Sequence, residues 1–337
     1  MKLFFDVSPA FYKTLMFNNL SKKEDILVVY RDNINRPFRG KDFLSEEKHF
    51  KNYTLSGNMF HVSLGIIKMI LKNRYNELIV GGYDSIYPWL AVLLSPRKKN
   101  GCIVESTYRE TRKGGVRAYA KRLFFKHISK AYVCGKSHSD LVKAFHFKGK
   151  IVDIGTVGFI RRIPQPPFEK RNSVKRFLYV GRLTRVKNLE WLIERFSKHP
   201  ELDLTIVGAG ELEEKLKSIS TTNIHFTGPV PNAELSKYYQ EADVFVLPSL
   251  LEPFGLVVEE ALNNGTPVLL SHMIGCQDNL VAAKNVGLVF QLNDVNDFEH
   301  KLNQICDINL YNNLRRNISK LDFEQFEEDM ANAFVGE

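Results

Sequence analysis

Two apolar runs, residues 242–249 and 267–270, limit the folds that this chain can adopt, together with the segment between them. Runs of this length fit buried strands. Between them, Pro253 and Gly255 can begin a helix, and residues 263–265 (Asn-Asn-Gly) can end one. Strand, loop, short helix and strand in this order form one turn of a parallel sheet. We therefore predict an α/β fold built on parallel strands.

Two carboxylates flank the predicted start of this helix. Glu252 lies in the loop before it, and Glu260 lies eight residues further along. The first N–H groups of a helix have no partner within the helix, and together with the helix dipole they bind anions. Carboxylates on either side can accept hydrogen bonds from hydroxyl groups. The arrangement suits a ligand with a phosphate in the middle and a sugar on each flank, which describes a nucleotide-sugar.

The same residues resemble the Glu-x7-Glu signature of the retaining family 4 glycosyltransferases. The run reads Glu-Pro-Phe-Gly-Leu-Val-Val-Glu-Glu-Ala-Leu, and Glu252 and Glu260 stand at the two glutamates of the signature. This resemblance implies the GT-B fold, in which two Rossmann-like domains face each other across a cleft. It also implies transfer of a sugar from a nucleotide-sugar with retention of configuration at the anomeric carbon.

The resemblance assigns a role to each part of this motif. Glu252 is expected to contact the hydroxyls of the donor sugar, and Glu260 those of the ribose. Phe254, Gly255 and Leu256 are expected to frame the phosphate site at the start of the helix.

A second match to the family lies at residues 176–188, where a strand ends at Gly181 and two cations, Arg182 and Lys187, precede a helix. In the family, the Arg and Lys of a similar pattern hold the donor diphosphate. A departing nucleoside diphosphate gains negative charge, which these cations would neutralise. We predict Arg182, Lys187 and Glu252 as the catalytic residues, with no metal ion and no cofactor. The chain contains no Asp-x-Asp pair, the metal-dependent diphosphate site of the other major glycosyltransferase fold.

Four further positions are predicted to contact donor or acceptor. Gly208 follows an apolar run over residues 202–207, where it can instead serve close packing of a strand against a helix. Val230 ends a segment that resembles the family segment whose backbone reads the nucleobase. Gly81 and Glu105 end two strands of the first half, and parallel sheets admit ligands at strand ends. A tight turn at Gly81 and a capping role for Glu105 are equally open. Many relatives carry a histidine near the latter position, and this chain has none there.

Length and composition indicate a two-domain globular protein. The 337 residues suffice for two ordinary domains, and 44% hydrophobic and 25% charged residues are typical of soluble proteins. Residues 159–174 carry several prolines without a clear period and are predicted as a linker. They separate an acceptor-side domain (1–158) from a nucleotide-sugar-binding domain (175–320). A final helix (321–337) is predicted to pack back toward the first domain.

Three absences in the sequence favour a cytoplasmic location. No run of about 18 apolar residues occurs, so no transmembrane helix is predicted. The N-terminus reaches Asp6 before the apolar core of a signal peptide could form. The four cysteines lie far apart, so neither a disulfide framework nor a zinc site is expected.

The net charge of +9 is unevenly distributed along the chain. Residues 1–160 hold 28 Lys and Arg against 13 Asp and Glu (+15), whereas residues 161–337 hold 19 against 25 (−6). Residues 109–126 are the most basic segment, with seven cations opposed only by Glu110. An apolar stripe interleaved with these cations is predicted to pack on the sheet as one helical face: Val116, Tyr119, Leu123, Phe124 and Ile128. We predict that the cations bind an anionic membrane surface, on the inner face of the cytoplasmic membrane.

The predicted function is retaining transfer of a sugar from a UDP- or GDP-type nucleotide-sugar to a glycan acceptor that is lipid-linked. Synthesis of a bacterial surface polysaccharide (O-antigen, capsule or lipopolysaccharide) fits such an enzyme. Two other functions remain open. An epimerase of GT-B-like fold would need acid and base residues that the sequence does not identify. A glucosyltransferase acting on nucleic acid would explain the basic half, although no nucleic-acid motif is present. A non-catalytic binding protein fits least well, since the sequence contains all the residues expected to bind the nucleotide-sugar donor.

Overall fold

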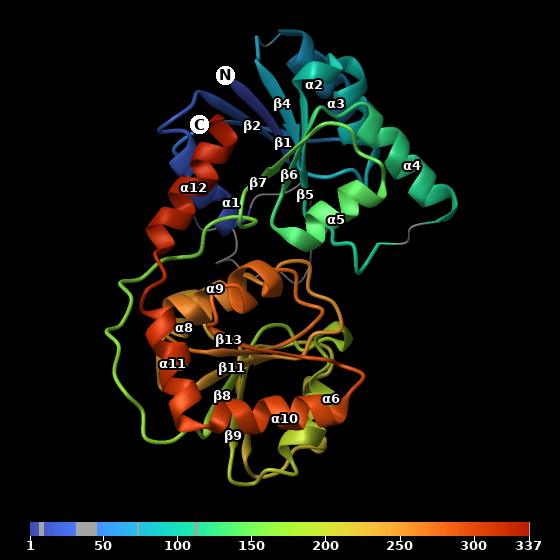
Figure 1. The fold of residues 1–337 in the computed structure, drawn as a ribbon. Helices are drawn as coiled ribbons and strands as arrows, with labels where there is room; N and C mark the ends of the chain where they lie inside the picture. The colour runs from blue at the N-terminus through green and yellow to red at the C-terminus, as the bar shows by residue number, and fades with distance from the viewer. Residues whose placement is uncertain (7–9, 32–45, 73, 112–113, 337) are drawn as a thin grey trace. The chain divides into compact units, whose positions relative to one another are not determined.

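The computed structural model describes residues 1–6, 10–31, 46–72, 74–111 and 114–336, and these form two units (Figure 1). The first unit contains Met1–Phe159 and Glu324–Glu337, and the second contains Ile160–Phe323. Each is a parallel sheet covered by helices, so the predicted α/β class is confirmed.

The first unit is built on a seven-stranded parallel sheet in the order β3-β2-β1-β4-β5-β6-β7. Its strands are β1 (Lys2–Asp6), β2 (Ile26–Arg31), β3 (Lys51–Leu55), β4 (Glu77–Val80), β5 (Asn100–Val104), β6 (Lys130–Val133) and β7 (Lys150–Asp153). Its helices are α1 (Phe11–Leu20), α2 (Met59–Lys72), α3 (Ile86–Leu94), η2 (Arg97–Lys99), α4 (Gly115–Lys126), α5 (Lys136–Ala144) and α12 (Phe323–Val335). The middle residues of the central strands β1, β4 and β5 are apolar and buried because helices cover both faces of the sheet.

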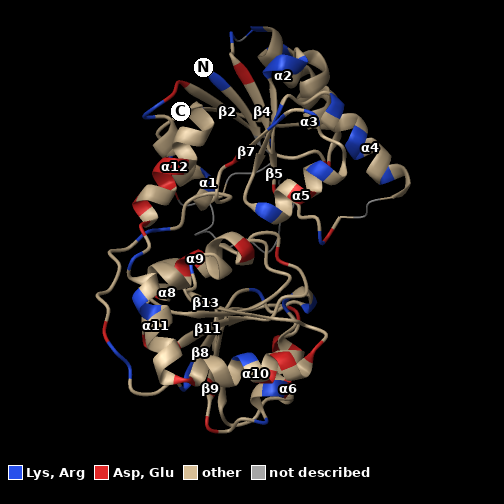
Figure 2. Cartoon of the chain, viewed as in Figure 1, with Lys and Arg blue, Asp and Glu red and all other residues tan. Residues whose placement is uncertain are grey.

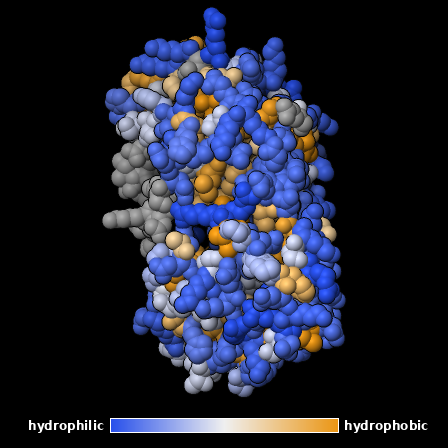
Figure 3. All heavy atoms as spheres, turned by 90° about the vertical axis from the view of Figure 1, so that its left-hand side faces the viewer, coloured by the Kyte–Doolittle hydropathy of each residue, from blue (hydrophilic) through white to orange (hydrophobic). Residues whose placement is uncertain are grey.

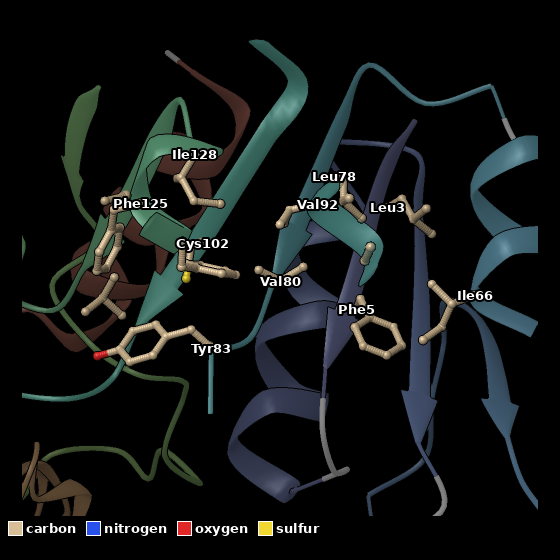
Figure 4. Packing of buried hydrophobic residues seen from close by; sticks show 14 of the residues in the cluster. Leu3, Phe5, Ile66, Leu78, Val80, Tyr83, Val92, Cys102, Phe125 and Ile128 are labelled. Carbon is tan, nitrogen blue, oxygen red and sulfur yellow. The ribbon is translucent and has the colours of Figure 1, made fainter. Parts of the chain in front are cut away.

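Large apolar side chains fill the space between this sheet and helices α2 to α5 (Figure 4). Phe5 and Val80 point from the strands toward Ile66 of α2 and Val92 of α3, and Phe125 of α4 lies near Cys102. On the opposite face, α1 and α12 pack on the sheet. The Phe4 ring contacts the rings of Phe17 and Phe334, with centroids 4.9 and 5.6 Å apart. The C-terminal helix is therefore part of the first unit.

The second unit is a six-stranded parallel sheet in the order β10-β9-β8-β11-β12-β13. Its strands are β8 (Arg176–Val180), β9 (Asp203–Val207), β10 (Ile224–Gly228), β11 (Val244–Leu247), β12 (Val268–Ser271) and β13 (Gly287–Phe290). Its helices are η3 (Arg185–Lys187), α6 (Leu189–Phe196), α7 (Glu213–Ser218), η4 (Asn232–Glu234), α8 (Leu235–Glu241), α9 (Leu256–Asn263), η5 (Gln277–Ala282), α10 (Val295–Cys306) and α11 (Ile308–Ile318). The predicted sequence of strand, loop, helix and strand is present as β11, α9 and β12.

Residues 160–175, most of the predicted linker, have no helix or strand and pack along the second unit. The Ile163 N–H donates to the side chain of Asn263 at 2.9 Å, and the Gln165 side chain donates to the Ile318 carbonyl at 2.8 Å. Hydrogen bonds to α9 and α11 thus fix this segment, which prolines keep from forming a helix.

The predicted packing of the basic helix is wrong in part. Val116, Tyr119 and Leu123 are 86%, 67% and 39% exposed, and the buried face of α4 is instead made by Ala118, Phe124 and Phe125, followed by Ile128. Apolar side chains lie on both the exposed and the buried side of this helix. On the buried side, Phe124 and Phe125 pack against the rings of Trp89 and Tyr83, with centroids 5.1 and 5.5 Å apart. The helix also begins at Gly115 rather than near Arg109, and the predicted cations Arg112 and Lys113 lie outside the described residues.

Figure 3 shows one face, on which hydrophilic side chains predominate and hydrophobic ones form small patches. No helix among the described residues has the length and apolar character needed to cross a membrane. All four cysteines are free thiols, and three of them are buried.

Candidate active site

The residues predicted to hold the donor lie at the point of the second sheet where the order of its parallel strands changes direction. From β8 the chain moves outward through β9 and β10, whereas from β11 it moves the other way through β12 and β13. Strands β8 and β11 are neighbours at this switch point, and ligands of open α/β sheets bind outside the carboxyl ends of such strands. The Arg182–Lys187 turn follows β8, and the loop with Glu252 follows β11.

The structure brings Lys187 and Glu252 together. The Lys187 ammonium forms an ion pair with Glu252 Oε2, and the two side chains are only 13% and 19% exposed. The turn and the loop are also joined through the backbone, because the Leu250 N–H donates to the Val186 carbonyl at 2.9 Å. The ion pair is thus held on two loops that are fixed to each other. A diphosphate arriving at Lys187 would compete with the Glu252 carboxylate for the same ammonium.

Arg182 lies on the turn that follows β8, with its side chain exposed to solvent. Tyr179, which is fully buried in β8, donates its hydroxyl to the Arg182 carbonyl at 2.9 Å. Burial raises the pKa of the Tyr179 phenol, the charge of Glu252 raises the pKa further, and the charge of Arg182 lowers it. The Arg182 backbone is thereby fixed to the end of β8 by a buried tyrosine.

Glycines let the backbones at this sheet edge approach closely. A Cβ added at Gly208 would lie 1.9 Å from the Gly181 carbonyl oxygen, and the Gly208 N–H donates to the Gly228 carbonyl at 2.9 Å. Gly208 therefore serves close packing of the ends of β8, β9 and β10, and its contact with a donor stays a prediction. Val230 lies two residues beyond the end of β10 and is partly exposed.

A second close approach fixes the loop before α9. Glu252 forms a parallel bridge with Ile274, and the Gly275 N–H donates to the Glu252 carbonyl at 2.9 Å. The Cys276 N–H donates to the Phe254 carbonyl at 3.1 Å. A Cβ at Gly275 would lie 1.7 Å from the Pro253 oxygen, so only glycine fits there.

Helix α9 begins at Leu256, directly after Gly255, whose φ of 101° lies in the left-handed region. No side chain caps this helix, and Phe254 is buried beneath its start. The predicted frame of Phe254, Gly255 and Leu256 thus surrounds uncapped N–H groups, which can bind an anion.

Glu260 lies one turn into α9 and is partly buried. Its Oε2 accepts a hydrogen bond from the hydroxyl of Tyr239 at 3.0 Å. Burial raises the pKa of Glu260 to about 7, while the Tyr239 hydrogen bond and the charge of Arg161 lower it. Glu260 is therefore a carboxyl group that can take up or lose a proton near neutral pH.

Two predicted residues belong to the first unit. Gly81 follows β4, and its N–H donates to the Phe5 carbonyl at 2.9 Å. Glu105 follows β5 and forms an ion pair with Lys13 at 2.6 Å. Glu105 lies at the carboxyl edge of the sheet and is partly exposed, whereas its partner Lys13 is only 5% exposed.

Three side chains that touch the predicted residues were not identified from the sequence: Tyr179, Tyr239 and Lys13. Each lies within an ordinary strand or helix, and none stands next to its partner in the sequence. The first two could be identified only from the fold, which shows that each hydroxyl group is buried near a predicted carboxylate.

Comparison with known proteins agrees with this geometry. The sequence model of the family described as "Glycosyl transferases group 1" matches residues 162–321. An uncharacterized glycosyltransferase of Haemophilus influenzae is 31% identical over 255 residues, which cover 73% of this chain and 70% of that protein. The O-antigen biosynthesis glycosyltransferase WbnH of Escherichia coli is 34% identical over 175 residues, 51% of this chain and 49% of that protein. In two further curated relatives, the matched part is only 25–30% of their length.

Solved structures share the fold. That of Anabaena HepE in complex with UDP superposes with a TM-score of 0.72, at 13% identity, over the full length of both chains. Two parallel-sheet α/β units of seven and six strands, similar to those of known glycosyltransferases, make up the GT-B fold. The chain belongs to the group 1 glycosyltransferases.

Proposed function

We propose that this chain is a retaining glycosyltransferase that moves a sugar from a UDP- or GDP-type nucleotide-sugar to a glycan acceptor. The observation that carries the proposal is the Lys187–Glu252 ion pair at the switch point, beside the uncapped start of α9. A cation for the diphosphate and a carboxylate for the sugar stand together where this fold class binds ligands. The UDP complex of the similar Anabaena protein supports a nucleotide donor.

In the proposed reaction, an acceptor hydroxyl attacks the anomeric carbon from the face that the leaving group departs from. The bond between that carbon and the diphosphate oxygen breaks, and the acceptor proton passes to the leaving phosphate. Arg182 and Lys187 neutralise the charge that grows on the diphosphate. The N–H groups at the start of α9 bind a phosphate oxygen, and Glu252 orients the sugar hydroxyls. No covalent nucleophile is needed.

Synthesis of a bacterial surface polysaccharide is the proposed setting, because WbnH of Escherichia coli is named for O-antigen biosynthesis. A thermal-shift screen of nucleotide-sugars tests the donor class. The true donor should raise the melting temperature by mass action, and a flat response to every UDP and GDP sugar would oppose the proposal.

The two glutamates should have separable roles. If Glu260 binds the ribose and Glu252 the sugar, Glu260→Gln should weaken binding of the free nucleoside diphosphate roughly tenfold. Glu252→Gln should leave that binding nearly intact and slow transfer. Calorimetry with the nucleotide alone, followed by a transfer assay, would distinguish them. Equal losses of nucleotide affinity in both variants would contradict this division.

No metal ion is proposed to take part. Arg182 and Lys187 would neutralise the leaving diphosphate, which is the task a metal performs in other transferases. Transfer should therefore continue at an undiminished rate in excess chelator. Loss of activity that magnesium or manganese restores would show that the two cations do not suffice.

We also propose that the first unit binds an anionic membrane, with the enzyme peripheral to the inner face of the cytoplasmic membrane and acting on a lipid-linked acceptor. Helices α2, α3 and α4 contain no Asp or Glu (Figure 2). Large apolar side chains are exposed on the same three helices: Met59, Phe60, Leu64, Leu71, Ile86, Leu93, Leu94, Val116, Tyr119 and Leu123. Exposed apolar groups among unopposed cations are typical of helices that lie at a bilayer surface.

The exposed cations of α4 should dominate this binding. Arg117, Arg122 and Lys126 are exposed, whereas Lys121 packs its ammonium 4.9 Å from the Tyr83 ring and is left unchanged. Each cation near an anionic surface contributes about 1 kcal/mol, and salt screens the attraction. Replacing the three with glutamate should abolish co-sedimentation with anionic vesicles at low salt.

A charge-matched control is available on the second unit, where Lys198, Lys215 and Lys237 are exposed. The glutamate triple variant of these lysines should still bind anionic vesicles, and neither triple variant should lose nucleotide affinity. Undiminished vesicle binding by the α4 variant, or no binding by the wild type, would refute the membrane proposal.

A further inference from the structure

Tyr239 lies in α8, packs against α9 and belongs to none of the motifs. Its side chain is 1% exposed, and its hydroxyl donates to Glu260 Oε2 at 3.0 Å. One oxygen of the Glu260 carboxyl group is thereby occupied by the protein, which leaves Oε1 for a ligand. A hydrogen bond to one carboxyl oxygen restricts rotation of the group and so limits the directions in which the other oxygen can point.

Two further contacts hold Tyr239 in place. The Thr266 hydroxyl donates to the Tyr239 carbonyl at 2.6 Å, which fixes the end of α8 to the turn before β12. The Tyr239 ring lies against Phe245 of β11, with centroids 5.8 Å apart. A buried ring held by a strand and a turn is a rigid donor, and rigid supporting residues keep a binding group in its productive geometry.

We propose that Tyr239 is a positioning residue that orients Glu260 for the ribose of the donor nucleotide. The inference rests on the proposed function, in which Glu260 accepts hydrogen bonds from the ribose hydroxyls. The Tyr239 hydroxyl favours the ionised form of that carboxyl group, which is the better acceptor. The charged group acting on Glu260 from another segment is Arg161, and it favours the same form.

Tyr239→Phe removes the hydroxyl and keeps the ring. We expect the dissociation constant of the nucleoside diphosphate to rise roughly fivefold to twentyfold, because a buried hydrogen bond to a charged group is lost. With the donor saturating, kcat should change less than twofold, since the reacting atoms are untouched. The affinity loss should grow as the pH falls from 8 to 6, because without the hydroxyl Glu260 keeps its proton to higher pH.

The matched control is Tyr311→Phe. Tyr311 is also 1% exposed, and its hydroxyl donates to the Asp243 carbonyl at 2.9 Å, away from the predicted donor residues. It reports the cost of losing any buried tyrosine hydroxyl, and we expect lower stability with unchanged nucleotide affinity. In a double-mutant cycle, Tyr239→Phe combined with Glu260→Gln should weaken nucleotide binding no further than Glu260→Gln alone.

The outcomes separate this inference from the proposed function. If Glu260→Gln weakens nucleotide binding but Tyr239→Phe binds within twofold of the wild type, the positioning role is wrong and the ribose contact stands. Additive losses in the double variant would also refute positioning. If Glu260→Gln binds normally, the ribose contact itself fails, and the inference fails with it. Should Tyr239→Phe not fold, Glu260→Asp provides the test. It withdraws the carboxylate from the Tyr239 hydroxyl, and normal nucleotide affinity in that variant would show that orientation is unimportant.

Discussion

Replacing Lys187 with alanine should lower the turnover of sugar transfer at least a hundredfold while the protein stays folded. Removing a charged contact to a group that gains charge in the transition state costs roughly 3–4 kcal/mol. Lys187 is the partly buried cation at the end of β8, and its partner Glu252 would lose its ion pair in the same variant. Arg182→Ala should have a loss of similar size. Steady-state transfer at saturating donor is the measurement, with circular dichroism as the check on folding.

Arg185 provides the matched control, because it is an exposed cation on the same turn and has no predicted contact with the donor. Its alanine variant should retain turnover within a few fold of the wild type. Near-normal turnover in both Lys187→Ala and Arg182→Ala would mean that the diphosphate is neutralised elsewhere.

Gly275→Ala should both destabilise the second unit and abolish transfer. The added Cβ would lie 1.7 Å from the Pro253 oxygen, so the loop before α9 must move away. That movement breaks the hydrogen bond from the Gly275 N–H to the Glu252 carbonyl and displaces Glu252. Overpacking against backbone should cost about 3 kcal/mol or more, a fall in melting temperature of roughly 6–12 °C for a unit of this size.

Gly114→Ala is the control for this substitution. A Cβ at Gly114 would meet no atom within 4 Å, and the residue has a φ of −127° that any amino acid adopts. Calorimetry should show an unchanged melting temperature for Gly114→Ala. A Gly275→Ala protein with wild-type stability and activity would show that the loop is not fixed as the structure has it.

The apolar strands and the motif that contains Glu252 and Glu260 could be predicted from the sequence, because each is specified by residues that are close together in the chain. Strands β8 and β11 are continuous apolar runs that end at Gly181 and Pro248, and such runs mark buried parallel strands whatever the rest of the chain does. Strand β3 was not predicted, because four of its five residues are exposed and its sequence, Lys-Asn-Tyr-Thr-Leu, is mostly polar.

What could not be predicted depends on contacts between distant parts of the chain. Both faces of α4 are apolar, so periodicity alone could not decide which of them packs on the sheet, and Val116 was assigned to the wrong face. Tyr239 and Glu260 are 21 residues apart, and only the packing of α8 against α9 joins them. Burial raises the pKa of Glu260 to about 7, and this shift depends on the fold and not on the motif.

Retaining transfer of a sugar from a nucleotide-sugar can be followed directly through the anomeric configuration of a labelled donor. The protein would be incubated with isotopically labelled UDP- and GDP-sugars and a membrane extract as the source of acceptor. NMR would then follow the labelled anomeric carbon. We expect that one donor releases its nucleoside diphosphate and that the sugar appears in the acceptor with its configuration retained. An inverted product, or an epimerised nucleotide-sugar without release of nucleoside diphosphate, would contradict this expectation.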